Sequence, residues 1–163
     1  TCDTSEDRDY LRELGAETVI VTEEEDLVGR LQKVTEGRGV DVVLDACGGS
    51  QMKLLGDVMA PLGKLILYGM NGGNETALPV CAAFKKNFKF FLHCLCDFTG
   101  QPELGIEQNR EAVERALQHI NQLTVDRLIW PQLDRQFPFE QAVEAHQYVE
   151  SGVPRGRVVL TLN

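Results

Sequence analysis

Two short apolar runs, each ending at a turn, constrain this chain most. Residues 40–44 are followed by Asp45, and residues 65–68 are followed by Gly69. Both runs are rich in Val, Ile and Leu, and one helix-length segment separates them, which is the pattern of buried parallel strands. Such strands build doubly wound sheets, which bind nucleotides outside the carboxyl ends of their strands. The sequence therefore predicts an α/β, Rossmann-like parallel sheet with a ligand site at those ends.

Helix and strand signals alternate along the chain, which is the order of strand, helix and strand units in parallel sheets. In the first part we expect helices from Ser5 to Gly15 and over residues 26–35 and 51–59, with strands over residues 18–21, 40–44 and 64–68. We then expect a helix at 81–86, an aromatic strand from Phe88 to Cys94, an irregular stretch through Gly105, a helix at 109–122, an irregular crossing at 128–137, a helix at 139–150 and a strand at 157–162.

Charge and cysteine content exclude several classes of partner. The formal net charge of -9 disfavours binding to nucleic-acid phosphates or to an anionic membrane, because an acidic surface is repelled by both. The longest apolar run is far shorter than the ~20 residues of a membrane span. Five scattered cysteines, an odd number, suit reduced thiols better than a disulfide framework, so we expect a soluble, cytoplasmic protein.

Three stretches, taken together, resemble one known family. They are residues 37–45 leading into Gly48 and Gly49, residues 61–64 with Tyr68 and Gly69, and residues 137–159 with Phe137-Pro138-Phe139 at the start and Gly156-Arg157-Val158-Val159 at the end. Their order and spacing are similar to the C-terminal part of the medium-chain dehydrogenase/reductase superfamily, in its zinc-type alcohol dehydrogenase-like and quinone oxidoreductase branch. The resemblance covers the whole chain.

This resemblance implies a sheet order of 3-2-1-4-5-6 in which Cys2 ends strand two. The first strand, with its Gly-rich phosphate turn, and the catalytic domain would then be absent. Residues 1–125 would form a partial dinucleotide-binding domain, and residues 126–163 would return to the catalytic domain of a longer oxidoreductase. No catalytic residue can be assigned, and we expect the chain alone to be inactive.

The resemblance also implies cofactor contacts. The loop containing Asp3, Thr4 and Arg8 would lie near the adenosine ribose. There Asp3 could accept hydrogen bonds from the ribose hydroxyls, and Arg8 could donate hydrogen bonds to a ribose phosphate. The small residues Ala46, Cys47 and Gly48 would border the adenine. The turn after the second run, formed by Tyr68, Gly69, Met70 and Asn71, would border the nicotinamide. The backbone of Phe91 and Leu92 would offer hydrogen-bonding groups to the carboxamide, and Arg157 would reach the pyrophosphate.

Each contact has a plainer alternative. Asp3 and Arg8 could be solvated charges at a helix start, Cys47 a buried thiol, and Arg157 a surface charge. Phe91 and Leu92 could belong to the core or to a subunit interface. The resemblance alone favours NADP over NAD, yet Asp7 stands where NADP-using relatives have lysine, so the preference stays open.

Three functions are compatible with these patterns. The leading hypothesis is an NAD(P)(H)-dependent oxidoreductase that transfers a hydride between nicotinamide and a small carbonyl, alcohol, or quinone or enone substrate. A methyltransferase-like domain shares the first two stretches but not the C-terminal one. The third hypothesis is a non-catalytic module that only self-associates. We expect a homodimer through the Phe88 to Cys94 strand whether or not the chain is catalytic. We expect no metal site at His93, Cys94 and Cys96, because alternate residues of a strand point to opposite faces.

Overall fold

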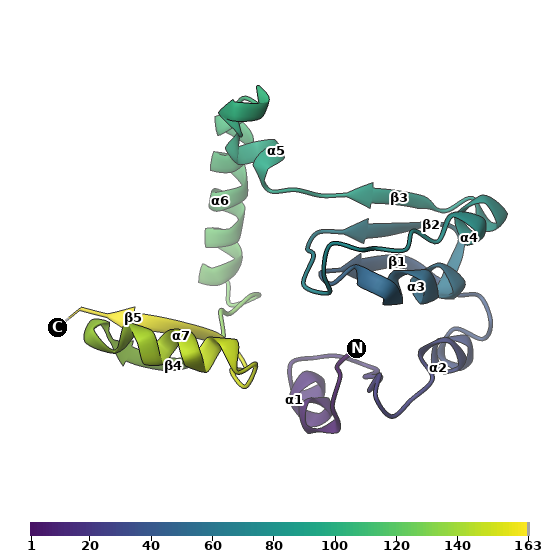
Figure 1. The fold of residues 1–163 in the computed structure, drawn as a ribbon, viewed down its shortest axis with the longest axis horizontal. Coiled ribbons are helices and arrows are strands. Elements are labelled where there is room, and N and C mark those ends of the chain that lie inside the picture. Colours follow the sequence, from purple (N-terminus) through teal and green to yellow (C-terminus); the bar gives the residue numbers. More distant parts are fainter. Residues whose placement is uncertain (163) are drawn as a thin grey trace. The chain divides into compact units, whose positions relative to one another are not determined.

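The computed structural model describes residues 1–162 and divides into two compact units (Figure 1). The first unit is Thr1–Asp97, and the second begins at Phe98. The expected domain boundary after residue 125 stays a prediction, since it refers to the domains of a longer protein.

The first unit is built on a parallel sheet of three strands in the order β1-β2-β3. Val43 lies opposite Leu65, and Leu65 lies opposite Phe90, so the middle strand pairs on both sides. Helices connect these strands, as the expected alternation requires, and the predicted Rossmann-like class is confirmed. The elements in chain order are β1 (Val40–Asp45), η2 (Gly49–Gln51), α3 (Met52–Val58), β2 (Met59–Leu67), α4 (Val80–Lys86) and β3 (Lys89–Leu92).

The core lies between one face of this sheet and the helices α3 and α4. Leu65 is fully buried in it, together with Met52, Met59, Leu67 and Phe88. Alanines of α4 pack against the same cluster, because small side chains let the helix approach the strands. The other face is open within the described residues: Val42 is 55% exposed, Leu44 67% and Phe91 46%. Only one face of the sheet is therefore covered.

The predicted strand at residues 18–21 is wrong. Val21 forms a single parallel bridge with Cys2, and no ladder continues from it among the described residues. The N–H of Cys2 donates to the Ile20 carbonyl (3.1 Å), and the N–H of Thr22 donates to the Cys2 carbonyl (2.9 Å). The chain bends at Asp3, directly after the bridge, so the pairing does not continue past Val21. Val19, Ile20 and Val21 are nevertheless buried, as the apolar pattern indicates.

Helices flank this bridge. They are η1 (Ser5–Asp7), α1 (Arg8–Glu13) and α2 (Leu27–Val34). The carboxylate of Asp26 caps α2 by accepting from the N–H groups of Val28 (3.2 Å) and Gly29 (3.1 Å). The first and second predicted helices are thus confirmed to within a few residues.

Strand β2 is longer than the predicted residues 64–68. It begins at Met59, directly after α3, and includes Pro61. Val40 lies opposite Met59 while Val42 lies opposite Lys64, so the register shifts between them. Leu62 has a φ of 63°, which fits such a β-bulge. Pro61 is tolerated because a bulged segment has no continuous ladder to interrupt.

The second unit contains a long helix and a small α/β layer. The helix α6 spans Arg110–Val125, capped by the side chain of Asn109, which accepts from the Ala112 N–H (3.0 Å). Two parallel strands follow with a helix between them: β4 (Leu133–Pro138), η4 (Phe139–Gln141), α7 (Ala142–Glu150) and β5 (Arg157–Thr161). Two stretches predicted to be irregular contain regular elements, namely β4 and, before α6, α5 (Cys96–Thr99) with η3 (Pro102–Leu104).

A polar cluster joins α7 to β4. The Tyr148 hydroxyl donates to Asp134 Oδ2 (2.9 Å), and the Arg135 guanidinium lies over the Tyr148 ring, 4.1 Å from its centroid. The Arg155 N–H also donates to Asp134, and this bond, followed by the tyrosine bond, lowers the pKa of Asp134. The same hydroxyl contact raises the pKa of Tyr148. Side-chain contacts therefore hold α7 against β4, in addition to the backbone pairing of β4 with β5.

None of the helices formed by residues 1–162 combines the length and apolarity that crossing a membrane requires.

Candidate functional site

Two loops lie side by side where β1 and β2 end. The Tyr68 N–H donates to the Asp45 carbonyl (2.9 Å), and the Asn71 N–H donates to the Ala46 carbonyl (3.2 Å). A third bond runs from the Gly72 N–H to the Cys47 carbonyl (2.8 Å). The structure thus brings together two of the predicted groups, residues 46–48 and residues 68–71, at the carboxyl edge of the sheet.

Glycines make this close approach possible. A Cβ on Gly69 would lie 2.5 Å from the Ala46 carbonyl oxygen, and one on Gly72 would lie 3.0 Å from that of Cys47. Gly48 has a φ of 65°, a conformation that L side chains rarely adopt. The loop after β2 therefore touches the loop after β1 by backbone, with no side chain between them.

Two further side chains shape these loops: Asp45, which the sequence placed at the turn without a side-chain role, and Thr76, which it did not indicate. The Asp45 carboxylate accepts from the N–H groups of Cys47 (3.0 Å) and Gly48 (2.9 Å), and the Thr76 hydroxyl accepts from the Gly49 N–H (2.9 Å). An Asp followed by two small residues after a strand is a recognised turn signal, so the capping role of Asp45 was predictable from the sequence. The role of Thr76 was not, because nothing in the sequence pairs it with a residue 27 positions earlier.

Phe91 and Leu92 lie at the same edge of the sheet. Phe91 pairs with Ile66 and Leu92 pairs with Leu67, while the His93 N–H donates to the Leu67 carbonyl (2.9 Å). Their backbone is thus level with the end of β2, next to the loops that follow β1 and β2. The predicted contact of this backbone with a carboxamide stays a prediction.

The loop containing Asp3, Thr4 and Arg8 lies beside residues 22–25. Asp3 Oδ1 accepts from the Thr22 hydroxyl (3.1 Å), and the Asp3 carbonyl accepts from the Glu23 N–H (3.3 Å). Thr4 precedes η1, and its side chain makes no capping bond there. The bridge between Cys2 and Val21 explains this proximity, because both loops leave from the same pair of residues.

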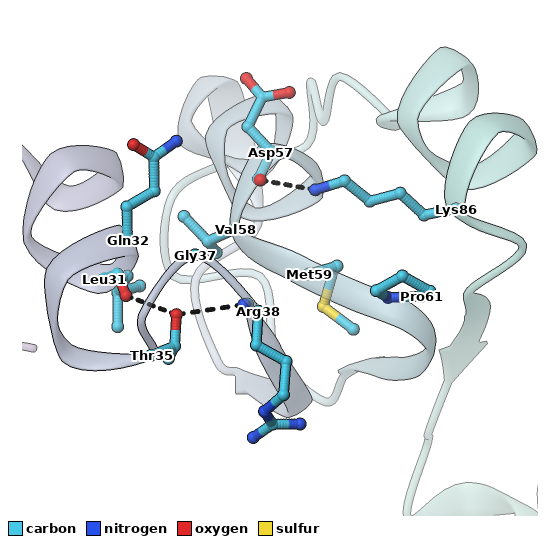
Figure 2. Close-up of a pocket in the computed structure, with 11 residues that line it drawn as sticks. Leu31, Gln32, Thr35, Gly37, Arg38, Asp57, Val58, Met59, Pro61 and Lys86 are labelled. Carbon is cyan, nitrogen blue, oxygen red and sulfur yellow. Dashed lines mark hydrogen bonds between the residues drawn. The ribbon is translucent and has the colours of Figure 1, made fainter.

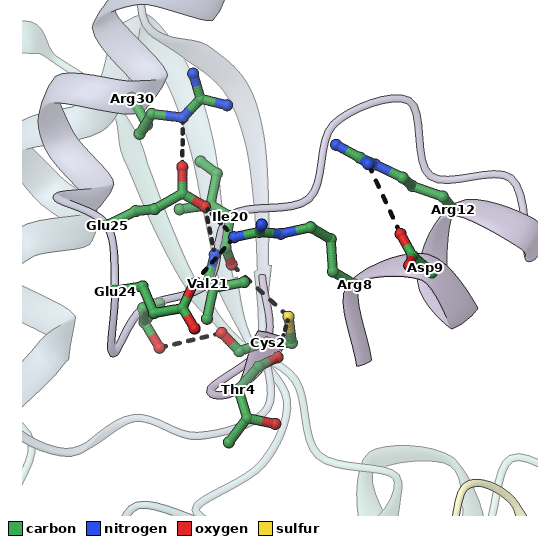
Figure 3. A network of polar contacts seen from close by, with 11 residues as sticks. Cys2, Thr4, Arg8, Asp9, Arg12, Ile20, Val21, Glu24, Glu25 and Arg30 are labelled. Carbon is green, nitrogen blue, oxygen red and sulfur yellow. Dashed lines mark hydrogen bonds and ion pairs between the residues drawn. The ribbon is translucent and has the colours of Figure 1, made fainter. Parts of the chain in front are cut away.

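Glu24 and Glu25, which we call the carboxylate pair, hold Arg8. Arg8 Nη2 donates to Glu24 Oε2 (3.3 Å) and to Glu25 Oε1 (3.1 Å), as Figure 3 shows. Glu25 Oε1 also accepts from the Val21 N–H (3.1 Å), and Arg30 Nε lies 2.7 Å from Glu25 Oε2. The Val21 bond, and then Arg30 and Arg8, hold the pKa of Glu25 below its ordinary value of 4.5, against the opposing effect of partial burial. Glu25 is therefore the centre of this ion-pair network.

A cavity of about 380 Å³ opens between the turn after Val21 and the start of α3. Its lining combines polar and apolar side chains, with Thr22, Glu25, Asp26 and Leu27 on one side and Ser50, Gln51 and Leu54 on the other. Ser50 and Gln51 come directly after the Gly48 and Gly49 turn, at the carboxyl end of β1. This cavity therefore adjoins both the ribose loop expected from the sequence and the loop of residues 46–48.

A second cavity, of about 260 Å³, lies at the opposite end of the strands (Figure 2). Gly39 and Met59, which line it, stand at the amino ends of β1 and β2. Its two cations are already paired: Arg38 forms two bonds with the Asp41 carboxylate (2.6 and 2.7 Å), which raise the pKa of Arg38, and Lys86 Nζ donates to the Asp57 carbonyl (2.6 Å). Since ligands of such sheets bind at the carboxyl ends, we do not assign this cavity to the site.

The family is decided by comparison with known proteins. A family model described as zinc-binding dehydrogenase matches residues 14–160 of this chain. The chain belongs to the zinc-binding dehydrogenase family. The expected membership of the medium-chain dehydrogenase/reductase superfamily is thereby confirmed.

Individual members of the superfamily are similar over nearly the whole chain. This chain is 26% identical to the rat synaptic vesicle membrane protein VAT-1 homolog, in an alignment that covers 93% of this chain and 39% of that protein. It is 24% identical to a Burkholderia 2-haloacrylate reductase, covering 98% and 46%. The fold matches that of the Escherichia coli quinone oxidoreductase complexed with NADPH, with a TM-score of 0.80 and 24% identity over 97% and 47%. The chain spans less than half the length of each of these proteins.

The residues at the carboxyl edge of the sheet offer groups whose chemistry suits a dinucleotide. The cavity beside Glu25 offers hydroxyl and amide groups from Thr22, Ser50 and Gln51, and carboxylates that accept from sugar hydroxyls. Arg157 is exposed at the start of β5 in the second unit, where its N–H donates to the Gln132 carbonyl (2.8 Å). Its predicted contact with a pyrophosphate stays a prediction.

The family description mentions zinc, which proteins bind through several His, Cys, Asp or Glu side chains together. Within residues 1–162, no three such side chains form a group that could hold a metal ion. The five cysteines in this range are all free thiols.

Proposed function

We propose that this chain supplies the cofactor-binding part of an NAD(P)(H)-dependent oxidoreductase. The observation that carries the proposal is the pair of backbone-linked loops at the carboxyl ends of β1 and β2, in a chain that a dehydrogenase family model matches. When bound, a nicotinamide cofactor supplies or accepts the hydride. The protein's part is to hold and orient it.

Each candidate residue has a place in this proposal. Asp3, Thr4 and the carboxylate pair border the adenosine ribose, and residues 46–48 leave room for the adenine because their side chains are small. Residues 68–71 and the backbone of Phe91 and Leu92 border the nicotinamide half, and Arg157 reaches the pyrophosphate. The shared carboxyl edge of β1, β2 and β3 supports the places given to residues 46–48, residues 68–71, Phe91 and Leu92.

The substrate is proposed as a small carbonyl, alcohol, quinone or activated alkene. One similar protein is a 2-haloacrylate reductase, and 2-haloacrylate is an activated alkene. Another is a quinone oxidoreductase. These names support reduction of a polarised double bond. The chain alone is expected to show no turnover.

The deciding experiment is a thermal-shift titration of the intact protein with NADH, NADPH and S-adenosylmethionine. Stabilisation by a nicotinamide cofactor is expected, since a ligand that binds the native state raises its stability. Ala46→Leu should weaken this shift by filling the space beside the β1 loop, whereas Ala16→Leu, at an exposed position outside the site, should leave it unchanged. A response to S-adenosylmethionine alone would favour a methyltransferase, and no response to any ligand would leave self-association.

A homodimer and a cytoplasmic location complete the proposal. The outer edge of β3 has no partner strand among the described residues, and an exposed edge is a template for pairing with a second copy. Sedimentation equilibrium of the intact protein would test this dimer, and a monomeric mass at micromolar concentration would contradict it. The five free thiols suit the reducing cytoplasm.

A further inference from the structure

We infer that the intact protein binds NAD(H) in preference to NADP(H), because the carboxylate pair withholds Arg8 from a ribose phosphate. The inference rests on the proposed function, since it specifies the form of the cofactor at the same site. In dinucleotide-binding folds an acid near the ribose accepts from its hydroxyls, whereas an arginine accommodates the 2′-phosphate of NADP. Arg8 is the cation of the expected ribose loop, so whether its guanidinium is available to a phosphate decides between the two forms.

Arg8 already has two anionic partners. A single nitrogen, Nη2, donates to both Glu24 and Glu25, and the side chain is only 31% exposed. A phosphate that approached this guanidinium would meet two carboxylates at the same nitrogen. Like charges at such short distances repel, and the repulsion grows as water is excluded. The positive charge of Arg8 is therefore compensated before any ligand arrives.

Glu25 cannot easily move aside to release Arg8. Its Oε1 is the acceptor for the N–H of Val21, a residue that is 0% exposed, and its Oε2 is paired with Arg30. Rotation of the Glu25 side chain would leave a backbone N–H of a buried residue without this acceptor, which is costly. The second carboxylate, Glu24, is half exposed and contacts Arg8 at the longer distance. Glu25 is therefore the residue that mainly holds Arg8 in place.

The cavity next to this network is lined by two acidic residues. Glu25 and Asp26 contribute carboxylates to its wall, and none of the described residues that line it is Lys or Arg. The Asp3 carboxylate, bonded to Thr22, lies on the neighbouring loop. These groups suit the two hydroxyls of an unmodified ribose, which can donate to carboxylates, and they disfavour a 2′-phosphate with its negative charge of nearly two.

The test measures dissociation constants of the intact protein for NADH and NADPH by isothermal titration calorimetry. NADH should bind at least about tenfold more tightly than NADPH. Adenosine 5′-monophosphate and adenosine 2′,5′-bisphosphate should show the same order, which places the discrimination at the ribose and not at the nicotinamide. These measurements need no turnover, so they do not depend on knowing the substrate.

The double variant Glu24→Gln/Glu25→Gln tests the mechanism. The amide oxygen introduced by Glu25→Gln can still accept from the Val21 N–H, so the turn is retained while Arg8 becomes available. The ratio of the affinity for NADH to that for NADPH should fall about tenfold, mainly because NADPH binds more tightly. Adding Arg8→Gln to the double variant should remove this increase in NADPH affinity. Glu13→Gln/Glu17→Gln, which removes the same charge from exposed positions outside the network, should leave the ratio unchanged.

The outcomes separate this inference from the proposed function. Tight binding of NADPH, equal to or better than NADH, would overturn the inference and leave the oxidoreductase proposal standing. An unchanged ratio in the double variant would show that the carboxylate pair is not the cause. Binding of neither cofactor would overturn both. If the double variant does not fold, as judged by circular dichroism, Glu24→Gln alone keeps the Val21 and Arg30 contacts and should shift the ratio in the same direction.

Discussion

Replacing Gly69 by alanine should disrupt the contact between the loops that follow β1 and β2. The added Cβ would lie 2.5 Å from the Ala46 carbonyl oxygen and 3.2 Å from the carbonyl carbon, whereas real Cβ contacts stay beyond 3.0 Å. The obstructing atom is backbone, so no side chain can rotate away. The same carbonyl accepts from the Asn71 N–H at 3.2 Å, and displacing it would also weaken that bond.

The cost can be assembled from two contributions. Forcing a methyl group into a filled space costs about 1–3 kcal/mol, and a weakened backbone hydrogen bond adds about 1 kcal/mol. We therefore expect the free energy of unfolding to fall by about 2–4 kcal/mol, which lowers the melting temperature by roughly 5–15 °C. Affinity for a nicotinamide cofactor should fall with it, since the displaced loop borders the proposed site.

Urea denaturation followed by circular dichroism measures this loss. Met70→Ala is the matched control, because Met70 is adjacent in the chain and 66% exposed, and its truncation should change stability by less than about 0.5 kcal/mol. If Gly69→Ala were as stable as the wild type, the two loops would not be in contact in solution. The geometry assigned to the site would then be refuted.

Two further outcomes test the core and the ion-pair network. Leu65→Ala should cost about 2–5 kcal/mol in urea denaturation, because Leu65 is fully buried, whereas Leu14→Ala, at an exposed position, should cost far less; similar losses for both would contradict the assigned core. Glu25 has a lowered native pKa, so it binds its proton more weakly in the native state than in the unfolded chain. Its stabilising contribution should be complete above pH 4.5 and be lost as the pH falls through the native pKa. The difference in stability between wild type and Glu25→Gln should therefore narrow as the pH falls below 4.5. Urea midpoints measured at a series of pH values give this difference. A difference that widened on acidification would show that Glu25 is not stabilised in its charged form.

Strand and helix placement followed from the sequence where one local signal dominated. The apolar run at residues 40–44 and the acidic cap at Asp26 each determine an element without help from distant residues. The register shift opposite Val42 is different, because it depends on pairing between two strands and extends β2 back through Pro61. The apolar residues at 19–21 are buried as predicted, yet a strand needs a partner, and Cys2 supplies one bridge only among the described residues.

The site was partly predictable for a similar reason. The ends of parallel strands converge, so residues 46–48 and 68–71 could be expected at one edge from strand order alone. The ion pairing of Arg8 could not, because Glu24 and Glu25 are 16 and 17 positions away and appear in the sequence as an acidic helix start. Resemblance assigned Arg8 to a ribose phosphate, and only the fold revealed its existing partners.

The short turn that follows β1 has a consequence for where a diphosphate can bind. Successive backbone N–H groups in a turn form a concave donor site that attracts anions. In this chain the Asp45 carboxylate occupies that position, since it accepts from both Cys47 and Gly48. The turn thus carries its own anion and presents a negative charge to anything that approaches. A dinucleotide can meet it through an uncharged ring or sugar, and the donors for its phosphates have to come from residues outside this turn, as proposed for Arg157.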